Sequence, residues 1–439
     1  MRILVLVNLY PPHHAGSFDL RCELVTEALR KRGHLVRVLT STHGVGAEQR
    51  DPEIERRLWL NGAFDHPLAT GFLALKSLET HNHAVLKDTV ADFEPELVHV
   101  WSLHGLSKPL VFGLRETRLP TAYDVADDWL AEGIRLDPWL RWWNEPAVRF
   151  PGGIFRKLLE LAGVRTRIDA AAPTRMMPGY DRMPDVYGPP EALALVQPDS
   201  IAAFRFERIY FSSQALKAKA QRAGFQVQHA EVIYPPVQTD VFAGPLRPSS
   251  APCKKLLFVG RLCRESGILT ALAALRLLRQ SKVPVTFSIY GRGESDFVAQ
   301  VRSFAVTHQL PVEFLTVSNL NRDLAAIFRQ HDALLHTAEW DEPFATTPLE
   351  AMANGLPVVA AQIGGLQELL RHGENALTYQ PGDAAGLAAC IQELSLQPAL
   401  RAQMAELAQN EVMSRFNESV TIDAIESFLE ATRQAWQGA

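Results

Sequence analysis

The short, purely apolar stretch at residues 3–7 constrains the fold most, because it opens a regular alternation of strand and helix patterns. A run of Ile, Leu and Val without polar alternation is typical of a strand that is buried on both faces. A glycine-containing loop comes next, then an amphipathic helical pattern over 19–32 and a second apolar strand over 35–40. A strand, a loop, a helix and a strand in this order form the unit of a parallel sheet with helices on both faces. We therefore expect an α/β fold built on doubly wound parallel sheets.

This alternation starts twice along the chain, which predicts two domains. The first series continues with strands expected at 97–101, 121–125, 208–213 and 232–236. The second series has strands expected at 255–260, 285–290, 312–317, 332–336 and 357–360. Proline, glycine and serine are frequent between the two series, as they are in linkers.

The length of 439 residues also exceeds the usual size of one compact domain. We expect an N-terminal domain over 1–238, interrupted near 130–200 by an insertion in which the alternation stops. A C-terminal domain is expected over 239–417. The amphipathic pattern over 418–439 predicts a last helix that packs back on the N-terminal domain.

Composition narrows the class of protein. A formal net charge of −5 gives no general attraction for nucleic acid. The four cysteines form no CxxC pair and do not resemble a disulfide framework, which favours a reducing compartment. The first apolar run ends at Asn8, too early for a signal peptide, and no run approaches the roughly 18–20 residues that cross a bilayer. We expect a cytoplasmic protein that binds no nucleic acid.

Residues 341–357 carry the clearest site signal, two glutamates eight positions apart. Glu342 lies in a loop, whereas Glu350 is expected in the first turn of a helix that Thr347 caps and Pro348 begins. An asparagine–glycine pair should end that helix early, before a buried strand. Two carboxylates, several backbone N–H groups and the positive end of a helix suit a polyhydroxylated, anionic ligand.

Further candidates come from the rule that ligands bind beyond the carboxyl ends of parallel strands. His104 follows the strand at 97–101, and Asp127 follows the strand at 121–125. Gly16 and Ser17 occupy the loop after the first strand, where glycine lets the backbone approach a ligand. Each has a plainer interpretation: His104 as a hydrogen-bonded structural histidine, Asp127 as a structural acid, and the glycine loop as a simple turn.

Four segments carry a resemblance to a known family. They are Tyr-Pro-Pro-His-His-Ala-Gly at 10–16, Lys-Arg-Gly-His-Leu-Val at 31–36, Val-Gly-Arg-Leu at 259–262 and the glutamate stretch with its tail at 342–359. On these residues the chain resembles the family 4 glycosyltransferases nearly from end to end. The resemblance implies the GT-B architecture, in which two Rossmann-like domains face an interdomain cleft.

The resemblance also implies a nucleotide-sugar donor, transfer with retention and no obligatory metal. It implies that Glu342 contacts the donor sugar, Glu350 the ribose hydroxyls and Arg261 the diphosphate. Backbone N–H groups near 344–346 would face the sugar and the β-phosphate. The catalytic candidates are Glu342, His104 and Asp127. The donor-binding candidates are Gly16, Ser17, Arg261, Arg264, Ser266, Gly291, Phe344, Ala345, Thr346, Thr347 and Glu350.

Two positions depart from the family pattern. Ser266 stands where the family usually has a lysine, so a phosphate-binding charge is missing, and Arg264 could replace it only from a different spacing. Ala126 stands where the family has a histidine that contacts the donor sugar. Asp127, Asp128 and His104 are the neighbouring groups able to take over that hydrogen bonding.

The segment 135–168 is basic within an acidic chain. It holds three tryptophans, seven basic residues and three acidic ones, a net charge of +4. Buried aromatics of an acceptor-binding subdomain are one interpretation, and a platform that stacks on sugar rings is another. The third is peripheral contact with anionic lipid, which flotation with anionic liposomes would test.

We therefore expect a retaining hexosyltransferase. Its donor would be a UDP- or GDP-sugar, and its acceptor a carbohydrate or lipid-linked hydroxyl in glycan, glycolipid or polysaccharide biosynthesis. One alternative is a glycosyltransferase that makes a small soluble glycoside. Another is a catalytically weak sugar-nucleotide binding protein, which Ser266 and Ala126 favour. A glycoside hydrolase is disfavoured, because Glu342 and Glu350 belong to one corner rather than to opposite sides of a scissile bond.

Overall fold

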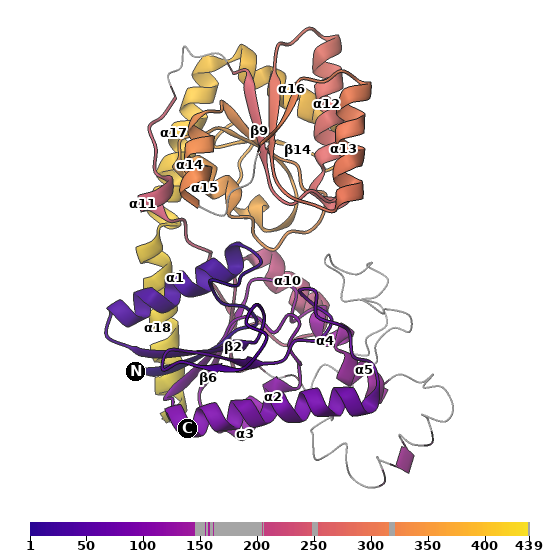
Figure 1. Cartoon of the computed structure of the whole chain (residues 1–439). Coiled ribbons are helices and arrows are strands. Elements are labelled where there is room, and N and C mark those ends of the chain that lie inside the picture. The colour runs from indigo at the N-terminus through magenta and orange to yellow at the C-terminus, as the bar shows by residue number, and fades with distance from the viewer. Residues whose placement is uncertain are drawn as a thin grey trace. The chain divides into compact units, whose positions relative to one another are not determined.

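The computed structural model describes residues 1–144, 154, 157–158, 161, 204, 206–247, 253–315 and 321–437 (Figure 1). The chain divides into two compact units. Met1–Ile233 together with Ile422–Ala439 forms the first domain, and Tyr234–Thr421 forms the second domain. Most of the insertion expected near 130–200, and most of the basic segment 135–168, lies outside the described residues.

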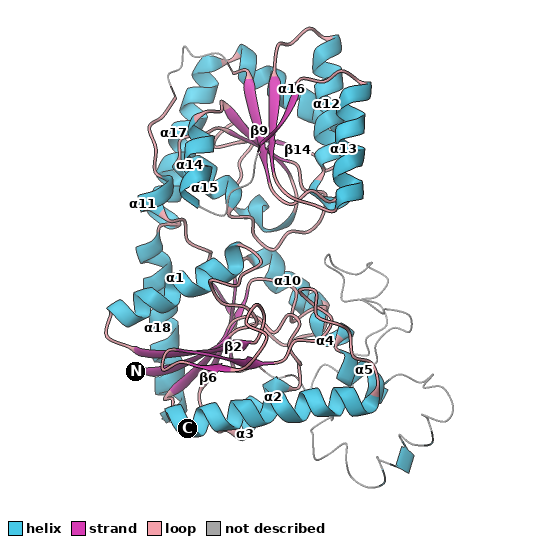
Figure 2. Cartoon of the chain, in the orientation of Figure 1, coloured by secondary structure: helices cyan, strands magenta, loops and turns pink. Residues whose placement is uncertain are grey.

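The first domain is built on an eight-stranded sheet in the order β3-β4-β2-β1-β5-β6-β7-β8. Figure 2 shows the strands of this domain in magenta, with β2 and β6 labelled. Its strands are β1 (Arg2–Leu6), β2 (Leu35–Ser41), β3 (Gln49–Arg50), β4 (Ile54–Leu58), β5 (Leu97–Val100), β6 (Thr121–Val125), β7 (Arg208–Phe211) and β8 (Glu231–Val232). The helices that the structure describes in this domain are α1 (Ser17–Lys31), α2 (Phe72–Phe93), α3 (Leu110–Glu116), α4 (Gly133–Leu136), α5 (Pro138–Asn144), α10 (Gln214–Arg222) and most of α18 (Glu418–Gln437). Neighbouring strands are parallel except for the β3–β4 pair.

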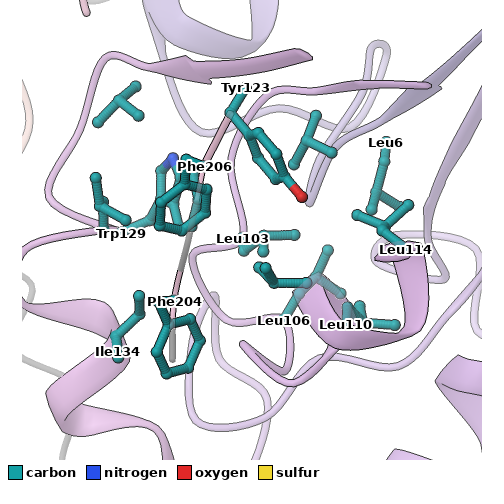
Figure 3. Close-up of a cluster of buried hydrophobic side chains, with 14 of the residues drawn as sticks. Leu6, Leu103, Leu106, Leu110, Leu114, Tyr123, Trp129, Ile134, Phe204 and Phe206 are labelled. Atoms are coloured by element: carbon teal, nitrogen blue, oxygen red, sulfur yellow. The ribbon is translucent and has the colours of Figure 1, made fainter. Parts of the chain in front are cut away.

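Alternating residues of β1 explain why helices cover both faces of this sheet. Leu4 and Leu6 belong to one core cluster, which includes residues of α2 and α3. Figure 3 shows part of this cluster, where Leu6 lies near Leu114 of α3. Ile3 and Val5 belong to a second cluster, which includes residues of α1 and α18.

Helix α18 is attached to the first domain by apolar and charged contacts. Four of its side chains repeat at helical spacing in the same core cluster as α1: Ile422, Ile425, Phe428 and Leu429. Arg32 pairs with Asp423 at 2.6 Å, and His34 Nε2 lies 2.7 Å from a Glu426 carboxylate oxygen. The glycine–histidine turn after α1 is therefore held against this helix.

The second domain is built on a six-stranded parallel sheet in the order β11-β10-β9-β12-β13-β14. Its strands are β9 (Lys255–Val259), β10 (Thr286–Tyr290), β11 (Val312–Leu315), β12 (Ala333–His336), β13 (Val358–Ala361) and β14 (Leu377–Tyr379). Its helices are α11 (Thr239–Phe242), α12 (Ile268–Gln280), α13 (Ser295–Thr307), α14 (Asn321–Arg329), α15 (Thr347–Ala353), α16 (Ala384–Leu396) and α17 (Pro398–Arg415). Two 3₁₀ turns, η1 (Arg264–Ser266) and η2 (Gly364–Glu368), complete it.

Alternating burial again produces two covered faces. Leu256 and Phe258 of β9 belong to one cluster with α12 and α16, while Leu257 belongs to another with α15. The strand order reverses between β9 and β12 in this domain and between β1 and β5 in the first. Such reversals are the topological switch points at which open α/β sheets bind ligands. The prediction of two doubly wound α/β sheets is confirmed.

Candidate functional site

The loops after β9 and β12 meet at the switch point of the second domain. The Thr337 hydroxyl donates to the Ser266 carbonyl at 2.7 Å, and the Glu339 N–H donates to the Glu265 carbonyl at 2.8 Å. Gly267 lies so close to Thr337 that a Cβ at this glycine would be 1.8 Å from the Thr337 carbonyl oxygen. The two loops are about seventy positions apart in the sequence. These contacts join them into one rigid edge.

Three of the predicted donor-binding residues lie on the β9 loop. Arg261 and Arg264 are exposed, so charged ligands can reach their guanidinium groups. Ser266 differs, because its hydroxyl donates to the Cys263 carbonyl at 2.7 Å. Its proton is thus committed within the loop, and the position adds no charge.

Glu342 follows β12 and is held through its backbone. Its N–H donates to the Trp340 carbonyl at 2.7 Å, and its carbonyl accepts from the Gly365 N–H at 2.9 Å. The side chain is about one-third exposed at 30%, and its carboxylate lies 3.2 Å from Nε2 of His336. The carboxylate is therefore positioned at the switch point while remaining open to a ligand.

Glu350 lies in the seven-residue helix α15, and the helix start differs from the expectation. The helix begins at Thr347, so Thr346 is the capping residue, and its side chain makes no capping hydrogen bond to the helix backbone. The prediction of Thr347 as the cap is wrong by one position. Burial raises the pKa of Glu350 to about 7, and a hydrogen bond from the Thr346 side chain opposes this shift. The hydroxyl thus serves the glutamate carboxylate rather than a backbone N–H.

Phe344 and Ala345 are core residues. Both are buried, and the Phe344 ring packs against Tyr234 and Phe416 at centroid distances of 5.3 and 6.0 Å. Their side chains anchor the loop between Glu342 and α15, so a ligand could meet only their backbone. Gly291 plays a related packing part, since a Cβ there would be 2.0 Å from the Gly260 carbonyl oxygen.

The remaining candidates gather in the first domain. Ser102 links His104 to Asp127: its hydroxyl donates to the Asp127 carboxylate at 2.7 Å and accepts from the His104 N–H at 3.1 Å. The Asn8 side chain, after β1, donates to the His104 carbonyl at 3.1 Å. The ends of β1, β5 and β6 are thereby joined by polar contacts at the switch point of this domain.

Gly16 and Ser17 are exposed at the start of α1, close in sequence to Asp19. Asp19 accepts from the Ala15 N–H at 2.8 Å and so shapes the glycine loop. Burial raises the pKa of Asp19 to about 7, opposed by hydrogen bonds from the Ala15 and Gly16 N–H groups and reinforced by the charge of Asp127. The negative charge of Asp127 therefore acts on Asp19, which shapes the glycine loop.

Asp128, the neighbour of Asp127, is structural. It is buried and pairs with Lys219 of α10 at 2.6 Å. The predicted residues therefore fall into two groups, one in each domain. Sequence reasoning missed His336, whose only signal was a polar side chain at the carboxyl end of a buried strand. Ser102 stood among the positions just beyond the strand at 97–101 but was not selected as a site residue.

Two further observations concern the described part of the chain. It contains no group of three or more His, Cys, Asp or Glu residues placed to hold a metal ion. None of the helices in the described ranges combines the length and apolar character needed to span a bilayer.

Comparison with known proteins finds sequence similarity within the second domain. Residues 249–411 match the family model of Glycosyl transferases group 1. The chain is 33% identical over 191 residues to a glycogen synthase of Mycobacterium tuberculosis, covering 43% of this chain and 45% of that protein. It is 32% identical over 197 residues to a D-inositol 3-phosphate glycosyltransferase of an Arthrobacter species, covering 41% of this chain and 45% of that protein. These matches span less than half the length of each relative.

Similarity of fold extends over both domains. A sucrose-phosphate synthase from Thermosynechococcus elongatus superposes with a TM-score of 0.68 at 16% identity, covering 100% of both chains. The Anabaena protein HepE, in complex with UDP and glucose, gives 0.63 at 20% identity, covering 98% of this chain and 99% of that one. The chain has the GT-B fold, and residues 249–411 of its second domain match the glycosyl transferase group 1 model.

Proposed function

We propose that this chain is a retaining glycosyltransferase of the family 4 type, which transfers a hexose from a UDP- or GDP-sugar to an acceptor hydroxyl. The observation that carries the proposal is the position of the matched residues. The group 1 match covers 249–411, and within it Arg261 and Glu342 lie on the loops that follow β9 and β12, the two strands that flank the switch point. The structures of HepE with UDP and with UDP-glucose make UDP-glucose the first donor to test.

In this proposal the arginines of the second domain stabilise negative charge, and its glutamates accept hydrogen bonds. Cleavage of the bond between the sugar and the β-phosphate leaves negative charge on the diphosphate, which Arg261 would stabilise, assisted by Arg264. Glu342, held by His336, would accept hydrogen bonds from the donor sugar, and Glu350 from the ribose diol. We assign this charge stabilisation to arginines, and the proposal needs no metal ion.

Retention follows in this proposal from attack on the face that the diphosphate leaves. The acceptor oxygen bonds to the sugar carbon as the bond to phosphate breaks, and the acceptor proton passes to a phosphate oxygen. No enzyme nucleophile is required. His104 and Asp127, joined through Ser102, are the first-domain groups proposed to orient the acceptor.

The acceptor is proposed to be a carbohydrate or a lipid-linked sugar. Within the basic segment Trp139 and Leu140 are buried in the core of the first domain, whereas Ile154, Leu158 and Leu161 are exposed, at 55%, 59% and 85%. Their spacing corresponds to one face of a helix, and exposed apolar groups beside basic residues suit a membrane surface.

A thermal-shift panel of UDP-, GDP- and ADP-sugars tests the proposed function. A ligand that binds the folded state alone raises the melting temperature, so one nucleotide class should stabilise the chain at millimolar concentration. Release of the corresponding nucleoside diphosphate in the presence of sugar acceptors should then follow. Absence of any shift across the panel would contradict donor binding.

A second candidate is a sugar-nucleotide binding protein with little transfer activity. The observation in its favour is Ser266, whose hydroxyl is engaged with the Cys263 carbonyl and which brings no charge to the leaving group. A donor that raises the melting temperature, with no transfer to a broad panel of acceptors, would favour this candidate.

Nucleoside binding should strengthen as pH rises through about 7. Burial raises the pKa of Glu350 to about 7, and its ionised form is the better acceptor for ribose hydroxyls. Calorimetric titration with the nucleoside avoids the phosphate group, which itself titrates near pH ~6. The Glu350→Gln variant should show a flat profile; a slope that persists in this variant would contradict the assignment.

The same raised pKa has a consequence for stability. The Glu350 carboxyl has a pKa of about 7 in the folded state and its ordinary value of 4.5 in the unfolded state, so the folded state binds the proton more tightly. The free energy of unfolding should therefore fall as pH rises from about 4.5 to about 7, and level off above that range.

A further inference from the structure

The β9–β10 pairing continues beyond both strands into their loops. Val259 pairs with Tyr290 at the end of the ladder, and Leu262 forms an isolated parallel bridge with Gly293 at the same offset. Between these pairs, the Gly260 N–H donates to the Tyr290 carbonyl at 3.1 Å and the Leu262 N–H donates to the Arg292 carbonyl at 2.7 Å. The register is therefore unbroken, and it pairs Arg261 with Arg292.

The flanking glycines make this close approach possible. A Cβ at Gly291 would be 2.0 Å from the Gly260 carbonyl oxygen, and one at Gly293 would be 2.0 Å from the Leu262 carbonyl oxygen. Any side chain at either position would push the loops apart. The glycine–arginine–glycine sequence thus fixes Arg292 beside Arg261 rather than merely forming a turn.

Paired residues of adjacent strands project to the same face, with backbones about 4.8 Å apart. Arg261 and Arg292 are both exposed, so two guanidinium groups share one face beyond the carboxyl ends of β9 and β10. A diphosphate offers enough oxygens for two guanidinium groups at once.

We infer that Arg292 is a further diphosphate-binding residue, which forms with Arg261 a two-arginine site for the nucleoside diphosphate. The inference rests on the proposed function and deepens it. Arg292 supplies from the β10 loop a positive charge that the β9 loop lacks at Ser266, whose hydroxyl is already engaged. The second arginine also explains how charge can be stabilised with a serine at that position.

Calorimetric titration of the full chain with UDP and with uridine tests the inference. If the thermal-shift panel selects another base, GDP and guanosine or ADP and adenosine take their place. Arg292→Ala should weaken diphosphate binding by about 10- to 100-fold and leave nucleoside binding unchanged, because a hydrogen-bonded charge pair is lost. Arg292→Gln should behave in the same way, and Arg292→Lys should retain part of the affinity. The salt dependence of diphosphate binding should also fall in Arg292→Ala.

Arg276, an exposed arginine in the second half of α12, provides the matched control, and Arg276→Ala should bind both ligands normally. Adding Ser266→Lys to Arg292→Ala should restore part of the diphosphate affinity. Diphosphate binding within about twofold of the unchanged chain in both Arg292→Ala and Arg292→Gln would overturn the inference. An equal loss for the nucleoside would also overturn it, and failure of the unchanged chain to bind any nucleoside diphosphate would overturn the proposed function as well.

Discussion

Replacing Glu342 by alanine should lower kcat/KM for sugar transfer by about 100-fold, since a carboxylate that accepts from the donor sugar is removed. The chain should stay folded, because the backbone holds this loop. The Glu342 N–H donates to the Trp340 carbonyl, and its carbonyl accepts from the Gly365 N–H, whatever the side chain. Initial rates of nucleoside diphosphate release, with circular dichroism as the check on folding, measure both expectations.

Glu350→Ala should act on donor affinity more than on turnover. We expect KM for the donor to rise by about 10-fold or more, since contact with the ribose is lost. The melting temperature should hold or rise at pH 8, because burial raises the pKa of this carboxyl and its ionised form is disfavoured in the folded chain.

Asp341→Ala supplies the matched control for Glu342→Ala. Asp341 is an exposed carboxylate in the same loop, so its removal changes the local charge equally. Its kcat/KM should stay within about twofold of the unchanged chain, as for most surface substitutions. Near-normal transfer by both Glu342→Ala and Glu350→Ala would contradict the assignment of these glutamates to the donor site.

The strands that were predicted best from sequence are those with uninterrupted apolar runs. Residues 3–7 and 255–260 carry no charge in their interior, and both proved to be central strands, β1 and β9. Strand β4 was not predicted, because three of its five residues are charged. Arg56 donates to the Tyr10 carbonyl at 3.0 Å, and Arg57 pairs with Glu55 at 3.2 Å, so the charges are buried with partners. Hydrophobic periodicity cannot detect a strand of this kind.

The candidate site shows the same division. Motif spacing identified Glu342 and Glu350 as a pair, but the contacts that position them come from distant parts of the chain. Gly364 illustrates this, since a Cβ there would be 2.3 Å from the Glu342 carbonyl oxygen. Ser102, which joins His104 to Asp127, is likewise visible only once β5 and β6 lie side by side. A single sequence contains the residues of such contacts but not their proximity.

Gly267→Ala should cause a larger loss of stability than alanine at any other glycine described in the second domain. The glycine has a φ of +67°, which strains other residues, and the new Cβ would lie 1.8 Å from the Thr337 carbonyl oxygen and 2.8 Å from its carbon. Backbone atoms cannot move aside as a flexible side chain can, so the β9 and β12 loops must separate. We expect a cost of more than about 2 kcal/mol.

Gly382→Ala separates the two causes of this loss. Gly382 has a φ of +77°, but no atom lies within 4 Å of its prospective Cβ, so it reports backbone strain alone. Calorimetric melting should show a fall of about 2–4 °C for Gly382→Ala and at least about 6 °C for Gly267→Ala. Gly267→Ala should also weaken donor binding, because Arg261 and Glu342 belong to the two loops that separate. Equal melting temperatures for the two variants would mean that the β9 and β12 loops separate at little cost. That result would contradict the inference that these two loops form a rigid edge at the switch point.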